Sequence, residues 1–256
     1  SFDEQDMVII GTPEECLQKF LKYEEADVDQ VLCYVNFGYL PQEFGVYPNE
    51  SAESLLDYFA ILKGISSRKE RKAKVEEVLH LTNLFEARKK HVSSYSGGMR
   101  QRFGIAQLLL NNPELIIVDE PTAGLDPVER KRFLNVLREI GTKNVVLFST
   151  HLVEDVNELC TDMAIMNFGK ILKRTSPFLA VKEYEGKVWT RQIPYSELDF
   201  FKSAYLYLSS SFNGDNSLTV RVYSDLLPGD SFVPAEKVGL EDVYFHSLIK
   251  TAQEHA

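Results

Sequence analysis

Residues 115–121 read LIIVDEP, and this stretch decides the class of fold. Its four apolar residues do not alternate with polar ones, which is typical of a strand covered on both faces in a parallel sheet. The strand ends in Asp119 and Glu120, so two carboxylates lie at the carboxyl edge of the sheet, where open α/β folds bind ligands. Asp119 is suited to a hydrated magnesium ion and Glu120 to polarising a water molecule. A strand end with a helix-capping acid explains the same residues.

Similar patterns continue on both sides of this stretch. Strands are predicted over 31–40 (VLCYVNFGYL) and in NVVLFSTH, 144–151, the latter buried on both faces. Helices are predicted over 50–64, 68–81 and 128–140, where apolar residues recur at helical spacing. Strands that alternate with helices indicate an α/β domain with a parallel sheet. MAIMNFGKIL, further on, is expected to form a strand hairpin.

The sequence pattern changes after Glu185. VWTRQI and LTVRVYS alternate as half-exposed strands, and the chain ends in a helix near LEDVYFHSLIK. We therefore expect a main domain and a small α+β appendage. They span residues 1–185, with an inserted helical subdomain at about 48–100, and residues 186–256.

Composition limits the partners and the compartment. The formal net charge of -10 argues against a nucleic-acid-coating surface, so we expect no nucleic-acid partner. The three cysteines, Cys16, Cys33 and Cys160, fit no metal or disulfide spacing and indicate reduced thiols in the cytoplasm. The first residues, SFDEQDM, have no signal-peptide character, and no apolar run approaches the ~20 residues of a membrane helix.

A second chemical motif is YSGGMRQR, residues 95–102. Ser96 and the two glycines after it precede a helical pattern, so backbone N–H groups are exposed at a helix start. Such a start favours anions through its unpaired donors and its dipole. The glycines allow a phosphate to approach the backbone closely. A serine-capped helix after a flexible turn is the alternative interpretation.

The order of the motifs resembles the ATPase subunits of ATP-binding-cassette (ABC) transporters. In that family YLPQ, which ends in Gln42, is similar to the Q-loop and YSGGMRQR to the signature motif. LIIVDEP is similar to the Walker B strand, GLDP to the D-loop, and STH, which ends in His151, to the switch histidine. The resemblance implies a fold like that of the P-loop NTPases, with ATP and Mg²⁺ as cofactors.

The resemblance assigns roles within one subunit. Asp119 is implied to support magnesium, and Glu120 to be the general base for the attacking water. His151 is implied to contact the terminal phosphate. Gln42 is implied to contact the metal and the water, and to couple the site to a membrane partner.

It also assigns roles across a dimer, formed with a second copy or with a homologous ATPase subunit. Ser96, Gly97 and Gly98 are implied to bind the terminal phosphate of ATP held by the opposite subunit. Asp126 is implied to cross the interface and help to place the shared site. The family usually has leucine where Tyr95 stands, a bulky change that keeps the donors.

Two further stretches resemble an export subgroup, EFGVYPNESAESLLDYFAILKG and the final GLEDVYFHSL. They imply an ATP-hydrolysing subunit that powers export through a separate membrane-spanning permease. Such a protein is cytoplasmic and peripheral on the inner face of the membrane. The segment 43–64 is implied to dock on the permease, although an ordinary packed helix pair explains the same pattern.

One family element is missing from residues 1–38. They contain no G-x-x-x-x-G-K-[ST], the Walker A loop whose backbone N–H groups and lysine cradle phosphates. MVIIGTPEEC, residues 7–16, has the order strand, turn, helix, but Glu14 and Glu15 repel a triphosphate. It resembles an element that family members carry after the switch histidine.

Three explanations of the missing loop stay open: truncation, a natural non-catalytic partner, or an unusual fold. Glu120 and His151 act on a phosphate held by their own chain, so their presence favours truncation. The alternative function is a non-catalytic subunit that supplies its signature motif to an intact partner. Because the Walker A loop is missing, we do not expect this chain alone to hydrolyse ATP. The neighbours of the missing strand are expected to expose apolar faces.

Overall fold

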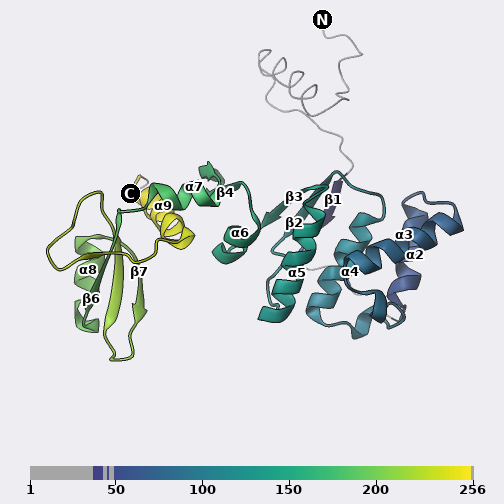
Figure 1. Cartoon of the computed structure of the whole chain (residues 1–256), viewed down its shortest axis with the longest axis horizontal. Coiled ribbons are helices and arrows are strands. Elements are labelled where there is room, and N and C mark those ends of the chain that lie inside the picture. The colour runs from purple at the N-terminus through teal and green to yellow at the C-terminus, as the bar shows by residue number, and fades with distance from the viewer. Residues whose placement is uncertain (1–36, 43–44, 46–48, 255–256) are drawn as a thin grey trace, which may run out of the picture. The chain divides into compact units, whose positions relative to one another are not determined.

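In the computed structural model, most of the chain forms two compact units (Figure 1). The described residues are 37–42, 45 and 49–254. Within them, the first unit runs to Val118 and includes residues 140–147, and the second holds residues 119–139 and 148 onward.

A three-stranded sheet forms the centre of the predicted α/β domain (Figure 1). It contains β1 (Phe37–Leu40), β2 (Leu115–Asp119) and β3 (Val145–Ser149) in that order. β1 pairs with β2 in parallel, and Phe37 lies opposite Leu115. This parallel sheet and its helices confirm the predicted fold class, an α/β fold of the P-loop-NTPase kind.

Helix α4 (Gly97–Leu109) packs against β1 at a glycine. A Cβ atom at Gly38 would lie 3.0 Å from the Cβ of Leu108, so a side chain there would crowd Leu108, which would have to move by a few tenths of an ångström. Gly38 and Leu40 are buried on this side of the sheet. The earlier residues of the strand predicted over 31–40 lie outside the described part of the chain.

The opposite face of the sheet is apolar and open. Phe37 and Tyr39 of β1 are 55% and 50% exposed, and Val145 and Leu147 of β3 are 66% and 58% exposed. No helix or strand of the described residues covers these side chains. An exposed face of this kind was the expected consequence of a missing neighbouring strand.

Strand β3 therefore corrects one prediction. Its continuous apolar sequence predicts burial on both faces, and the structure contradicts this. The N–H of Val145 donates to the carbonyl of Glu114 over 2.9 Å, which places Val145 beside Leu115. Val145 thus lies on the same open face as Phe37, the partner of Leu115 in β1. A continuous apolar run indicates a strand whose two faces are suited to burial, but it does not show whether another element packs on each face.

The helices between β1 and β2 form a packed group in the first unit. Ser51 and Ser67 cap α2 and α3 through their hydroxyl groups. Arg71 of α3 reaches Asp57 of α2 over 2.9 Å. The two helices predicted here are confirmed, whereas the boundaries of the helical subdomain stay a prediction. The elements are α2 (Ala52–Leu62), α3 (Arg68–Leu81) and the 3₁₀ turns η2 (Phe85–Ala87) and η3 (Val92–Ser94).

The second unit begins with two segments, one that follows the carboxyl end of β2 and one that follows the carboxyl end of β3. Helix α5 (Pro127–Ile140) matches the helix predicted over 128–140. After α6 (Val153–Leu159), the antiparallel strands β4 (Met163–Asn167) and β5 (Lys170–Thr175) form the predicted hairpin. No helix in the described part of the chain is long and apolar enough to cross a bilayer.

The last part of the second unit is an antiparallel sheet with helices. Its strand order is β7-β8-β6-β9. The two predicted strands are confirmed as β6 and β8, while β7, α7 and α8 were not predicted. The elements are α7 (Pro177–Glu183), β6 (Val188–Ile193), η4 (Tyr195–Glu197), α8 (Leu198–Ala204), β7 (Leu206–Phe212), β8 (Leu218–Tyr223), β9 (Val233–Pro234) and α9 (Leu240–Glu254).

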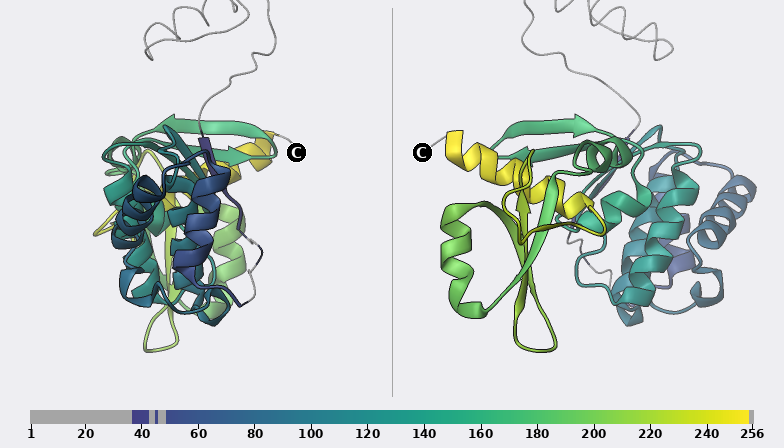
Figure 2. Two further views of the ribbon diagram at one scale, coloured as in Figure 1. Left: turned by 90° about the vertical axis from the view of Figure 1, so that its right-hand side faces the viewer. Right: turned by 60° about the vertical axis from the view of Figure 1, so that its left-hand side comes forward.

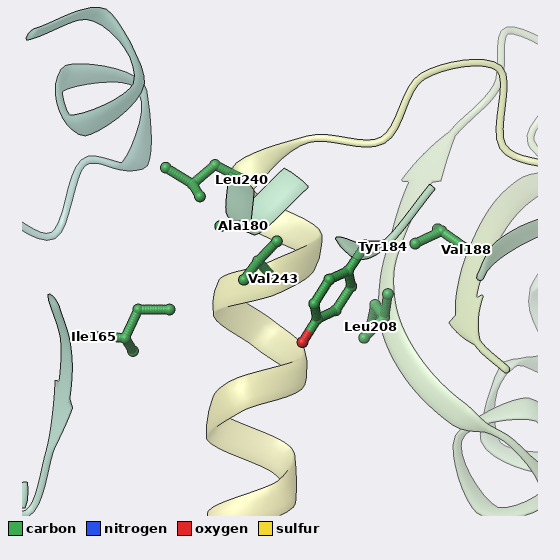
Figure 3. Packing of buried hydrophobic residues seen from close by; sticks show 7 residues of the cluster. All are labelled: Ile165, Ala180, Tyr184, Val188, Leu208, Leu240 and Val243. Carbon is green, nitrogen blue, oxygen red and sulfur yellow. The ribbon is translucent and has the colours of Figure 1, made fainter. Parts of the chain in front are cut away.

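Helix α9 packs against several elements of this unit and contributes to a shared buried core (Figures 2 and 3). Val243 on α9 belongs to one buried cluster with Ile165 of β4, Ala180 of α7 and Leu208 of β7. Figure 3 shows the ring of Tyr184 between α9 and Leu208. The terminal helix thus shares a core with elements on both sides of residue 185. The predicted domain boundary at that residue stays a prediction.

The open sheet face predicts a contrast between two alanine substitutions. Leu147→Ala removes an exposed side chain and should change the free energy of unfolding by less than about 0.5 kcal/mol. Ile116→Ala empties a fully buried position on β2 and should cost about 2–5 kcal/mol. Urea denaturation followed by circular dichroism measures both. A cost for Leu147→Ala that approaches that of Ile116→Ala would mean that the face is covered.

Candidate functional site

The carboxyl ends of β2 and β3 lie side by side and hold the predicted acids. The backbone N–H of Glu120 donates to the carbonyl of Ser149 over 3.1 Å and to its hydroxyl over 3.2 Å. The hydroxyl of Ser149 donates to Asp119 Oδ1 over 2.5 Å. Ser149 is therefore a site residue that was not predicted. Its position two residues before His151, in the STH stretch, was the available signal.

Glu120 and His151, the two predicted catalytic residues, are in direct contact. Their atoms Oε2 and Nδ1 lie 2.8 Å apart. The Glu120 side chain is 22% exposed and that of His151 is 65% exposed, so the pair is open to a ligand. Because a carboxylate only accepts, the ring places its proton on Nδ1 in this contact. The other ring nitrogen, Nε2, then has a lone pair for a further partner when the ring is neutral.

Glu120 has an unusual backbone conformation. Its φ angle is +43°, in the left-handed region that residues other than glycine rarely occupy. Such a conformation costs about 1–3 kcal/mol and is typical of functional sites. The two contacts of the Glu120 N–H with Ser149 hold it in place. This backbone conformation turns the chain at the edge of the sheet, so that β2 ends at Asp119 and Glu120 does not continue the strand.

Asp126 caps helix α5 beyond the acids. Its Oδ1 accepts hydrogen bonds of 2.9 Å from the N–H groups of Val128 and Glu129. This is ordinary helix capping. The residue is exposed, and the role implied for it at a dimer interface stays a prediction.

The serine–glycine–glycine stretch begins helix α4, as predicted. The hydroxyl of Ser96 accepts from the N–H of Met99 over 3.2 Å. The first N–H groups of a helix have no acceptor within the helix. Those of Gly97 and Gly98 have none among the described residues. Gly97 is exposed, so its donor is accessible to an anion, whereas Gly98 is buried.

Tyr95 fits its place before this helix. The side chain is buried, its hydroxyl donates to the carbonyl of Ala87 over 3.0 Å, and its ring meets the edge of Phe103. Burial raises the pKa of Tyr95 to about 12. The bulky residue therefore anchors the helix start to the 3₁₀ turn η2 without covering Gly97.

Gln42 follows the carboxyl end of β1 and is exposed. Its backbone carbonyl accepts from the side chain of Gln101 on α4 over 3.4 Å. Among the residues that the structure describes, none donates a hydrogen bond to the buried Gln101 Oε1 atom. This hydrogen bond between the predicted Q-loop and α4, the helix that begins at the signature motif, was not predicted, because the sequence analysis assigns no role to Gln101.

The predicted site residues fall into two sets. The second unit brings Asp119, Glu120 and His151 together and places Asp126 at the start of α5. The first unit holds Gln42 and the serine–glycine–glycine helix start.

The donor set fits a magnesium ion that is shared with a nucleotide. The described residues contain no group of three or more histidine, cysteine, aspartate or glutamate side chains that could hold a metal. Magnesium is usually bound by one or two carboxylates together with waters and substrate phosphates. Asp119, held by Ser149 through one oxygen, matches that pattern. The sequence has no matching residues for the loop that binds the phosphates of the nucleotide, since it contains no GK[ST] motif.

Comparison with known proteins relates part of the chain to one family. A sequence profile of the family described as ABC transporter matches residues 18–123. This segment includes Gln42, the YSGGMRQR motif and the acid-tipped strand β2. Residues 18–123 therefore carry an ABC transporter domain sequence, and the family resemblance predicted from the motifs is confirmed.

Individual relatives agree with this assignment. The chain is 38% identical over 179 residues to the uncharacterized ABC transporter ATP-binding protein YxlF of Bacillus subtilis (strain 168), covering 65% of this chain and 60% of that protein. It is 34% identical over 136 residues to the linearmycin resistance ATP-binding protein LnrL of the same organism, covering 53% and 43%.

A third relative is the probable multidrug ABC transporter ATP-binding protein YbhF of Escherichia coli (strain K12). The chain is 29% identical to it over 159 residues, covering 62% of this chain and 27% of that protein. The chain thus spans 60% or less of the length of each of these relatives.

The buried Tyr95 predicts a pH-dependent stability. Its folded pKa of about 12 lies above the ordinary value of 10.0, so its contribution is complete below pH 10.0 and is lost as the pH rises through about 12. Urea unfolding should therefore show a smaller loss of stability above pH 10.0 in Tyr95→Phe than in the wild type. At neutral pH, Tyr95→Phe should cost about 0.5–1.5 kcal/mol through the lost bond to Ala87.

The exposed Tyr39 supplies the control for this experiment. Tyr39→Phe should leave both the neutral stability and its alkaline decline unchanged. Equal behaviour of the two variants would contradict the anchoring role of Tyr95.

Proposed function

We propose that this chain is an ATP-binding and ATP-hydrolysing subunit of an ABC transporter that powers export. The observation that carries the proposal is the 2.8 Å contact between Glu120 and His151 at the carboxyl edge of β2 and β3. A general base needs a positioned carboxylate within reach of a water molecule. This pair supplies one, on a strained turn that faces solvent. The family match supports ATP as the nucleotide.

In the proposed mechanism Glu120 orients the attacking water and accepts its proton. The Nδ1–H of His151 holds the Glu120 carboxylate in place. When Nε2 of His151 also carries a proton, it donates to an oxygen of the terminal phosphoryl group as a positioning contact. Phosphoryl transfer depends mainly on such positioning and on electrostatic stabilisation, because the protein makes no covalent bond.

Asp119 is the proposed magnesium-binding residue of the site. A bound magnesium ion would neutralise charge on the phosphate oxygens. Asp119 would hold it through a carboxylate oxygen or a bound water, and the metal contact implied for Gln42 stays a prediction. The Ser149 hydroxyl fixes the orientation of the Asp119 carboxylate.

The signature helix is proposed to act on a neighbouring subunit. Gly97 presents an accessible N–H at the start of α4, which favours a phosphate through hydrogen bonding and the helix dipole. A dimer with a second copy or a homologous ATPase subunit would bring this helix start to the partner's nucleotide. Asp126 is proposed to lie at the same interface.

The proposed membrane partner docks on α2. Tyr58, Ile61 and Leu62 are 56%, 48% and 65% exposed, and their spacing places them on one face of this helix. An exposed apolar stripe on a helix is a common protein interaction site. We propose that it receives the permease, which places the protein in the cytoplasm at the inner face of the membrane. The names of LnrL and YbhF, which refer to linearmycin resistance and to a probable multidrug transporter, support export.

A second candidate function follows from the missing phosphate cradle. The 256 residues contain no GK[ST] motif. In the second candidate function, the chain completes the site of a partner that has one. In this case the start of α4 is functional, whereas Glu120 is not used. The two candidates differ in which residue the activity needs.

Substitution of Glu120 tests the first candidate. The chain is assayed for ATP hydrolysis alone and mixed with an intact homologous ATPase subunit. Glu120→Gln should lower kcat by about 10²- to 10⁴-fold, the usual contribution of a general base. Glu114→Gln is the matched control, since Glu114 is an exposed acid just before the same strand. It should leave the rate unchanged.

Gly97→Asp completes the comparison because it places a negative charge at the helix start. Activity that is lost in Gly97→Asp but kept in Glu120→Gln would support the non-catalytic candidate and contradict the first. Activity that needs neither residue would contradict both.

The docking stripe makes a separate prediction. Ile61→Asp should reduce copurification of the chain with its membrane subunit at least tenfold, because it places a charge in an apolar contact. Val233→Asp, at a 59% exposed position in the appendage, is the matched control and should bind normally. Equal binding by both variants would exclude α2 as the docking site.

A further inference from the structure

Two side-chain bonds join the segments that carry Glu120 and His151. The outer bond is the exposed Glu120–His151 contact. The inner bond runs from the hydroxyl of Thr122 to Asp155 Oδ2 over 2.5 Å. Thr122 follows Glu120 by two residues, and Asp155 follows His151 by four. The inner bond therefore links the same two segments below the surface, and all four residues belong to the second unit.

Asp155 is the centre of the inner contact. Its side chain is fully buried, and both of its oxygens are used. Oδ2 accepts from Thr122, which is 2% exposed, and Oδ1 accepts from Arg130 Nε over 2.7 Å. The bond to Asp155 is also the main reason why the pKa of Arg130 is raised above its ordinary value. A buried carboxylate with two donors has little freedom to move.

Arg130 extends the network to a third segment. Its backbone N–H donates to the carbonyl of Asp126 over 2.8 Å, in the first turn of α5. Its guanidinium also contacts Glu154 over 3.2 Å. Asp155 is thus connected to the turn after β2, to the start of α5 and to the segment after His151.

A stabilising role alone does not explain this arrangement well. Burying an ion pair costs desolvation energy, and apolar residues of similar volume are often as stabilising. A buried polar network does fix one arrangement of its segments. Here the segments are the ones that carry the general base and the histidine of the proposed site.

We propose that Asp155 is a positioning residue that, through Thr122 and Arg130, sets the contact between Glu120 and His151. Its importance for hydrolysis rests on the proposed function, whereas its control of the contact does not. Asp155 does not touch the reacting atoms. It fixes the spacing of two segments so that the His151 ring reaches Glu120.

The test observes the His151 ring directly. In ¹⁵N-labelled protein, the ring nitrogen shifts report which nitrogen carries the proton when the ring is neutral. The His151 signal is assigned by its loss in His151→Gln. In the wild type it should show the Nδ1–H form, because Nδ1 donates to Glu120.

Two variants of Thr122 separate hydrogen bonding from packing. Thr122→Val keeps the volume but removes the donor, and it should shift the His151 signal away from the Nδ1–H form. Thr122→Ser keeps the donor and should retain the wild-type signal. Equal signals in these two variants would overturn the proposal.

Asp155→Asn tests the centre of the network against a matched control. Asp242 is 4% exposed and accepts from Arg221 over 2.8 and 2.6 Å, so it forms a similar buried pair away from the site. Asp155→Asn should shift the His151 signal, and Asp242→Asn should not. No shift in Asp155→Asn, or the same shift in both, would overturn the proposal.

The Thr122 pair decides the result if Asp155→Asn fails to fold. ATP hydrolysis, where it is detected, should fall at least tenfold in Thr122→Val with little change in KM. If no variant and no wild type hydrolyses ATP, the proposed function fails, while the ring signal still decides the role of Asp155.

Discussion

The pairing of β2 with β3 is the constraint on which the site depends. Because the strands are parallel and end together, Asp119 lies beside Ser149 and Glu120 starts the turn beside His151. A shift of the register by one residue would turn the acids to the other face of the sheet. The backbone bond from Glu120 to Ser149 closes the pairing at the point where the chemistry begins.

The same sheet also shows what the described chain lacks. Its edge strands carry exposed Phe37, Tyr39, Val145 and Leu147, and no described element covers them. Parallel sheets are normally covered on both faces. The phosphate cradle, which the family places on a further strand and helix, has no motif in this sequence either.

Sequence reasoning was most successful where local chemistry determines the structure. The acids after the apolar run LIIV, the histidine after VVLFST and the serine cap of α4 follow from strand length and capping rules, and the structure places each where the pattern predicts it. The burial of β3 was wrong because an apolar run does not reveal which distant element covers it. Thr122 and Asp155 were missed because the bond between them joins residues 33 positions apart.

The most direct test of the account locates the nucleotide-bound metal. Mn²⁺·ATP in place of Mg²⁺·ATP broadens the NMR signals of nearby residues, and the chain has five histidines as reporters. In the chain paired with an intact homologous subunit, the account predicts that the His151 signal broadens strongly while that of His246 stays sharp. Broadening at His246 without His151, or none at any histidine at saturating nucleotide, would contradict it.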